Sequence, residues 1–113
     1  MEKNHVIKLV RMKCTANALL SDIKTRTFPA DMIILFGSIA QNNITEHSDM
    51  DICIVSDEDI TIRQKRDIEN YFADMVQDEF KLDFVYCDKD KLKNGTHVFE
   101  SIRKYGRVLY ERL

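Results

Sequence analysis

Long apolar runs are missing from this sequence. No stretch approaches the roughly 20 consecutive apolar residues that span a bilayer as a helix. The opening residues Met1–His5 also lack the extended apolar segment of a signal peptide. These absences exclude proteins that cross the bilayer through apolar helices, and we expect a cytoplasmic protein.

Proline and cysteine are also scarce. One proline, 44% hydrophobic and 32% charged residues are typical of a folded globular chain without low-complexity tracts. The cysteines Cys14, Cys53 and Cys87 are odd in number and form no CxxC pair, so we expect reduced, buried thiols. A formal net charge of -2 argues against a general nucleic-acid binder. The length suffices for one small domain, which we expect to span residues 1–113.

Two kinds of apolar pattern alternate along the chain. Apolar residues recurring every three or four positions predict helices over about His5–Ile23, over about Thr61–Phe80, and from Val98 to Gly106. Short apolar runs predict strands at Met32–Phe36, Asp51–Val55 and Lys81–Cys87, with an edge strand within Arg107–Leu113. Turns or connections are predicted at Thr27–Asp31, Asn42–Asn43, Asp88–Lys91 and Asn94–Gly95, with one helical turn at Ser38–Gln41 and Thr96 as the last N-cap. The result is an α/β (α+β) fold with a sheet layered by helices.

One stretch of the chain carries the chemistry. The first strand ends in Gly37 and Ser38, and ten residues later Asp49 and Asp51 open the second strand. Side chains alternate along a strand, so these two carboxylates point to the same face. Two like charges held so closely resist joint ionisation, and we therefore expect a divalent cation, Mg²⁺, between them. Backbone N–H groups after Gly37 and the Ser38 hydroxyl are ready donors for phosphate oxygens.

Asp83 is an isolated acid inside the apolar run of the third strand. Such a residue is costly to bury unless it is paired with a metal or a cation. If the third strand lies beside the second, Asp83 completes a trio of carboxylates. Two metal ions held by such a trio clamp the attacking and leaving oxygens of an in-line phosphoryl displacement. The alternative is an ordinary exposed residue at the start of a strand.

With these motifs the chain resembles the minimal nucleotidyltransferase (MNT) domains of the DNA polymerase β-like superfamily. It is most similar to the MNT antitoxins that are encoded beside HEPN toxins. The resemblance implies a polymerase β-like fold, with a small mixed β-sheet flanked by helices. The residues that carry it are Gly37-Ser38, the pair Asp49-x-Asp51 after a fixed gap, Asp83 in its apolar strand, and the closing segment Ile102–Tyr110.

The resemblance also implies a role for each residue of the motif. The catalytic residues and the ligands of two Mg²⁺ ions would be Asp49, Asp51 and Asp83, with Asp83 as the candidate base. The residues that hold the ATP triphosphate would be Gly37, Ser38 and Ser48. Family members of this type move AMP from ATP to a tyrosine hydroxyl of a HEPN ribonuclease toxin, which silences the toxin. The implied partner is such a toxin, encoded nearby and bound in a hetero-oligomer.

The chain departs from the family pattern after Ser38. Relatives often read Gly-Ser-Arg-Ala-Arg-Gly, whereas this chain has Ile39, Gln41 and Asn42 in place of both arginines and the last glycine. Two cations that support phosphates are therefore absent. Two other functions remain open at this point. One is an antitoxin that blocks its toxin by contact alone, and the other is the nucleotide-binding subunit of a small-molecule nucleotidyltransferase.

Overall fold

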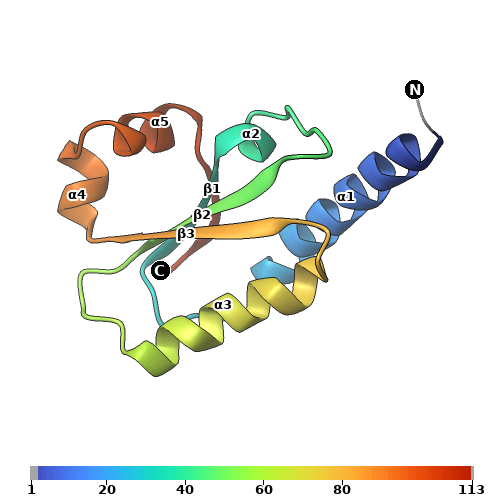
Figure 1. Cartoon of the computed structure of the whole chain (residues 1–113). Coiled ribbons are helices and arrows are strands. Elements are labelled where there is room, and N and C mark those ends of the chain that lie inside the picture. Colours follow the sequence, from blue (N-terminus) through green and yellow to red (C-terminus); the bar gives the residue numbers. More distant parts are fainter. Residues whose placement is uncertain (1–2, 113) are drawn as a thin grey trace.

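The computed structural model describes the backbone of residues 3–112 and the side chains of residues 6–112 (Figure 1). Met1, Glu2 and Leu113, which the predictions included, lie outside the described residues. The helices are α1 (Lys3–Asp22), α2 (Gly37–Ala40), α3 (Ile62–Val76), α4 (Lys89–Asn94) and α5 (Val98–Tyr105), with a short 3-10 turn η1 (Ile23–Thr25). The strands are β1 (Met32–Phe36), β2 (Asp49–Val55), β3 (Lys81–Cys87) and β4 (Arg107–Glu111).

The strands form one mixed sheet in the order β3-β2-β1-β4. Strand β1 runs antiparallel to both β2 and β4, and β2 runs parallel to β3. A parallel pair needs a crossover connection, and α3 supplies it between β2 and β3. This arrangement confirms the predicted fold class, a small mixed sheet flanked by helices.

Helices cover the two faces of the sheet unequally. On one face α1 and α3 pack over the main core, in which Leu19, Ile52 and Phe72 are almost completely buried (Figure 1). On the other face α4 and α5 cover a smaller core around Cys53 and Ile102. Figure 1 shows α4 and α5 over the end at which β2 and β3 finish. Helix α2 follows β1 at the end at which β2 and β3 begin (Figure 1).

Most predicted boundaries agree with the structure. Strands β1 and β3 have the predicted limits, and α5 ends at Gly106 as expected. Strand β2 begins at Asp49 rather than Asp51, because Asp49 already pairs with Lys81 of β3. Helix α3 ends at Val76 rather than Phe80, because Gln77 takes the left-handed conformation that terminates helices. Asn42 is also left-handed, with φ at 60°, and follows α2 as predicted.

Two predictions after β3 are wrong. The segment Asp88–Lys91 is not a plain connection, since helix α4 begins at Lys89 and Asp88 caps it by accepting a hydrogen bond from the Lys91 N–H at 2.7 Å. The N-cap of α5 is His97 rather than Thr96. Helix α4 is only six residues long and has little apolar periodicity, so the pattern on which the prediction relied does not reveal it.

The cysteines agree in part with the expectation of reduced, buried thiols. All three cysteines are free thiols, and Cys53 is buried and Cys87 half-buried. Burial was wrongly predicted for Cys14, which is exposed on the outer face of α1. Of the helices that the structure describes, none is long and apolar enough to cross a membrane.

Candidate active site

The antiparallel pairing of β1 with β2 brings Gly37 against Asp51. Phe36, the last residue of β1, is paired with Asp51 in the strand register, so the turn that follows β1 lies beside this carboxylate. Gly37 has φ at +77°, a conformation that residues with a Cβ rarely adopt. A Cβ atom at Gly37 would overlap Asp51 Oδ2 and lie 3.1 Å from Asp51 Cγ. The glycine therefore both forms the turn and leaves room for the carboxylate.

Two serines close the base of the loop between α2 and β2. Ser38 Oγ donates to Ser48 Oγ across 3.2 Å, and Ser48 Oγ accepts from the Thr45 N–H at 2.8 Å. A backbone hydrogen bond also holds the loop close to Ser38, since the Asn43 N–H donates to the Ser38 carbonyl at 2.8 Å. Both hydroxyls thus lie together beside the start of α2. Within the described residues, no side chain caps the backbone N–H groups at that start.

The parallel pairing of β2 with β3 brings Asp83 to the same place. Asp51 and Asp83 are direct partners in the register, and Asp49 is partnered by Lys81. Alternation along each strand puts Asp49, Asp51 and Asp83 on the face that carries α4 and α5, at the end where β2 and β3 begin. Asp51 is half-buried, whereas Asp49 and Asp83 are exposed. Burial raises the pKa of Asp51, and the charges of Asp83 and Asp49 raise it further.

These carboxylates suit a hard divalent cation that is shared with a substrate. In the described part of the chain, no three His, Cys, Asp or Glu side chains are gathered as a complete metal cage. Mg²⁺ does not need one, because it is usually held by one or two carboxylates together with phosphate oxygens. Burial and the charges of Asp83 and Asp49 raise the Asp51 pKa. A cation bound beside these carboxylates would offset their mutual repulsion. The donor set therefore fits Mg²⁺ bound with a nucleotide.

The structure shows where Ile39 and Gln41 lie, and it adds Lys81 to the residues of the site. Ile39 is 4% exposed and packs in the main core, so its position points away from the carboxylates, whereas Gln41 is exposed. Lys81 is the cation that the register sets opposite Asp49. The sequence analysis missed Lys81, although its spacing of two residues from Asp83 on one strand indicates the same face.

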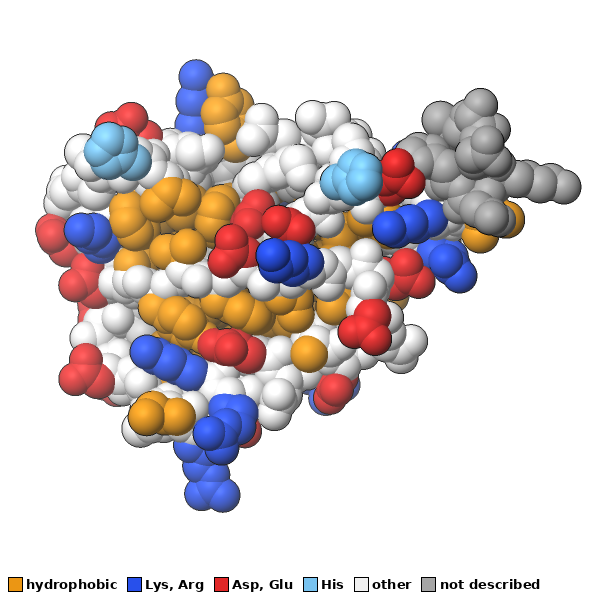
Figure 2. Space-filling view, viewed as in Figure 1, with side chains coloured by type: hydrophobic (Ala, Val, Ile, Leu, Met, Phe, Trp, Pro, Cys, Tyr) orange, Lys and Arg blue, Asp and Glu red, His pale blue; other side chains and the backbone are white. Residues whose placement is uncertain are grey.

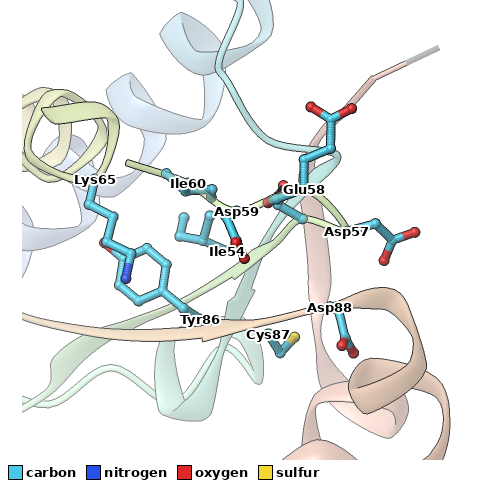
Figure 3. Close-up of a pocket in the computed structure, with 10 residues that line it drawn as sticks. Ile54, Asp57, Glu58, Asp59, Ile60, Lys65, Tyr86, Cys87 and Asp88 are labelled. Carbon is cyan, nitrogen blue, oxygen red and sulfur yellow. Dashed lines mark hydrogen bonds between the residues drawn. The ribbon is translucent and has the colours of Figure 1, made fainter. Parts of the chain in front are cut away.

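A cavity of about 320 Å³ lies at the opposite end of β2 and β3 (Figure 3). Its lining comes from the β2–α3 loop, from the end of β3 and from Lys65, whose ammonium lies 4.7 Å from the centre of the Tyr86 ring. Two of its acids already have structural partners, because Asp88 caps α4 and Asp57 accepts from the Lys89 N–H at 2.9 Å. None of the predicted site residues lines this cavity, which is therefore separate from the carboxylate site.

Comparison with known families agrees with this geometry. Residues 18–113 match the family described as "Polymerase beta, Nucleotidyltransferase", a segment that includes all four strands and every predicted site residue. The chain belongs to this nucleotidyltransferase family. The predicted resemblance to polymerase β-like nucleotidyltransferases and the predicted fold are thereby confirmed.

Several known proteins are similar to this nucleotidyltransferase domain. A Methanocaldococcus jannaschii protein that carries the name "Putative protein adenylyltransferase" is 42% identical over 65 residues, which are 58% of each chain. The match thus spans little more than half the length of that relative. The fold is similar to a chain in a crystal structure of a toxin-antitoxin with AMP-PNP, with a TM-score of 0.54, 20% identity, and 87% and 72% of the two chains covered. A mutant of the toxin-antitoxin MntA-HpeT is similar at a TM-score of 0.51 and 19% identity, covering 86% and 70%.

The electrostatic strain at Asp51 leads to a measurable prediction for this domain. Without divalent cations, Asp51→Asn should raise the unfolding midpoint by about 2 °C or more, since the amide removes the charge that Asp83 and Asp49 repel. A raised carboxyl pKa means that the contribution of Asp51 to stability is greatest below the ordinary titration range of Asp and falls as pH rises through the folded-state pKa. Calorimetry from pH 3 to pH 8 in EDTA should show a smaller fall for the variant. Asp59→Asn, an exposed acid at the other end of β2, is the control and should leave the fall unchanged.

Proposed function

We propose that this chain is a Mg²⁺-dependent nucleotidyltransferase that moves AMP from ATP to a hydroxyl, in particular that of a tyrosine, on a HEPN ribonuclease toxin. By this modification it acts as the antitoxin. The observation that carries the proposal is the register that sets Asp51 opposite Asp83 and beside Gly37. The names of the adenylyltransferase relative and of the toxin-antitoxin structures support the choice of donor and partner. We further propose that residues 1–113 act as one minimal domain in the cytoplasm.

Each part of the site has a role in this reaction. The triphosphate would be held by the N–H groups at the start of α2 and by the residues Gly37, Ser38 and Ser48. Lys81 lies on the carboxylate face and supplies a positive charge for phosphate oxygens in place of the arginines that Ile39 and Gln41 replace. Asp49, Asp51 and Asp83 would hold Mg²⁺. When bound, the ion neutralises phosphate charge and aligns the reacting oxygens.

The transfer itself is an in-line displacement at the α-phosphorus of ATP. The acceptor oxygen forms a bond to this phosphorus, and the bond from phosphorus to the oxygen that bridges to the β-phosphate breaks. Pyrophosphate leaves with that bridging oxygen, and AMP stays on the acceptor. The proton of the acceptor hydroxyl passes to the carboxylate of Asp83, which is exposed and therefore accessible to an incoming protein.

A contact-only antitoxin is the second candidate, and one observation favours it. Ile39 is buried in the core, so the strand-to-helix turn lacks a cation that relatives often have at this position. An inactive site of this kind would leave inhibition to surface contacts.

Labelled ATP distinguishes these functions. The chain is incubated with ATP labelled at the α-phosphate, Mg²⁺ and the HEPN toxin encoded beside it, and the toxin is then analysed by mass spectrometry. We expect AMP on a toxin tyrosine and loss of ribonuclease activity in proportion to the label. Inhibition of the toxin without label would identify a contact-only antitoxin. Label on a small molecule alone would identify a small-molecule nucleotidyltransferase.

A further inference from the structure

The two edges of the sheet differ in how well they are protected from further strand pairing. Natural sheets protect their edges with short strands, bulges and charges. Strand β4 has all three, with five residues, a register shift between Ile33 and Ile34 of its partner, and the terminal charges Arg107 and Glu111. Strand β3 has seven residues in unbroken register, and its charges Lys81 and Asp83 lie only at its beginning. The edge formed by β3 is therefore open to another strand.

At every second residue of β3, the backbone N–H and C=O groups point away from β2. The Cys87 carbonyl accepts a hydrogen bond from the Ser56 N–H at 2.9 Å, so Cys87 and the residues two and four positions before it face β2. Because the direction alternates along a strand, the N–H and C=O groups of Leu82, Phe84 and Tyr86 face away from the sheet. In residues 3–112, no strand pairs with this side of β3. Three residues thus present donors and acceptors for an added strand.

Apolar side chains border this edge on both faces of the sheet. Figure 2 shows orange side chains above and below a band of white atoms, with a group of acidic side chains near the middle of the view. Leu82, Phe84 and Tyr86 are half-buried on the α3 face, where Phe84 stacks on Tyr86 with ring centres 6.5 Å apart. Val85 and Cys87 are half-buried on the other face. A strand added here would cover apolar surface on both sides.

The row of catalytic carboxylates ends at the same edge. Asp51 of β2 is followed across the sheet by Asp83 of β3, and no further strand follows within the described residues. Facing side chains on paired strands have Cβ atoms about 5 Å apart. A residue opposite Asp83 on an added strand would therefore continue this row and lie next to the candidate base.

We propose that the acceptor protein presents an extended segment that pairs with the outward edge of β3, and that the modified hydroxyl residue lies opposite Asp83. This inference rests on the proposed function and specifies how the acceptor binds. Backbone pairing supplies affinity, as in other complexes formed by strand addition. Specificity comes from apolar residues of the segment beside Phe84 and Tyr86 on one face and beside Val85 on the other. The acceptor is therefore recognised as an extended, alternating segment rather than as a helix.

A proline at an outward position tests this binding mode. Tyr86→Pro removes an N–H group that faces away from β2, which edge strands tolerate, and its ring obstructs an incoming strand. Tyr86→Ala is the matched control, because both variants lose the hydrogen bond to Glu69 and the contact with Lys65, but only the alanine keeps the N–H group. We expect the KM for the HEPN toxin to be at least tenfold higher in Tyr86→Pro than in Tyr86→Ala. The KM for ATP should be the same in both.

A measurement on the unaltered chain covers the case in which Tyr86→Pro does not fold. NMR amide exchange with AMP-PNP and Mg²⁺ should show slower exchange at Leu82, Phe84 and Tyr86 when the toxin is added. Equal toxin KM values in the two variants, or unchanged exchange at these amides, would overturn strand addition while AMP transfer still stands. Protection that depends on the concentration of the chain alone would assign the edge to a second copy. Absence of any label on the toxin would overturn the proposed function itself.

Discussion

Replacing Asp49 and Asp51 together by asparagine is expected to lower AMP transfer to the toxin about a thousandfold or more, which corresponds to about 4 kcal/mol of transition-state stabilisation. Asparagine keeps the shape of each side chain, so β2 should keep its register with β1 and β3. Two of the three negative charges that attract Mg²⁺ would be lost. The measurement is kcat/KM with ATP labelled at the α-phosphate, at a fixed toxin concentration.

Three further results make this experiment decisive. The double variant should fold with a cooperative transition, because the exposed Asp49 and half-buried Asp51 contribute to no hydrophobic core. The matched control Asp57→Asn plus Asp59→Asn changes two acids at the other end of β2 and should keep transfer within about twofold. If the Asp49 and Asp51 double variant still inhibits the toxin fully without labelling it, the antitoxin acts by contact and the proposed chemistry is wrong.

Gly37→Ala is expected to lower kcat/KM about a hundredfold and to destabilise the fold by about 1–3 kcal/mol. The stability loss follows from the φ of +77°, which is strained for any residue with a Cβ. The loss of activity has a second cause, since the new methyl group overlaps Asp51 Oδ2 and forces this carboxylate away from Asp83. Stability is measured by denaturant unfolding and activity by label transfer.

A control at Asn42 separates these two causes. Asn42 also has a positive φ, of 60°, and is exposed in the loop that follows α2. Asn42→Ala should therefore cost stability through backbone strain without touching Asp51. If both variants lose activity to the same degree, backbone strain in the turn explains the effect. A Gly37→Ala variant with full activity would contradict the close packing of Gly37 against Asp51.

Sequence periodicity predicted the helices and strands of this fold better than it predicted which strands pair. The apolar run of β1 lies between Asp31 and Gly37-Ser38, so its limits were clear, and the spacing of Asp49 and Asp51 placed them on one face. The sequence does not encode in any short segment that β3 runs parallel to β2, because this pairing depends on the crossover through α3. The neighbour relation of Asp51 and Asp83 was therefore conditional until the register was known.

The features that the sequence left undetermined are those that depend on packing and strand register. Ile39 occupies a position where relatives often have a cation, but its apolar side chain turns into the main core. Lys81 precedes an apolar strand and looks like an ordinary surface charge until the register sets it opposite Asp49. Helix α4 is six residues long, is capped by Asp88 and has no apolar stripe of its own.

Because α3 connects β2 to β3, the two parts of the site are expected to form at different stages of folding. Gly37 and Asp51 belong to antiparallel neighbours that are close in sequence, so the loop that joins them closes at low entropic cost. Asp83 reaches Asp51 only when α3 has docked and the parallel pair has formed, and such non-local pairings form slowly. In a chain emerging from the ribosome, the turn at Gly37 and Ser38 would thus form before Asp83 reaches its place beside Asp51. The proposed AMP transfer would then become possible only after the parallel pair of β2 and β3 has formed.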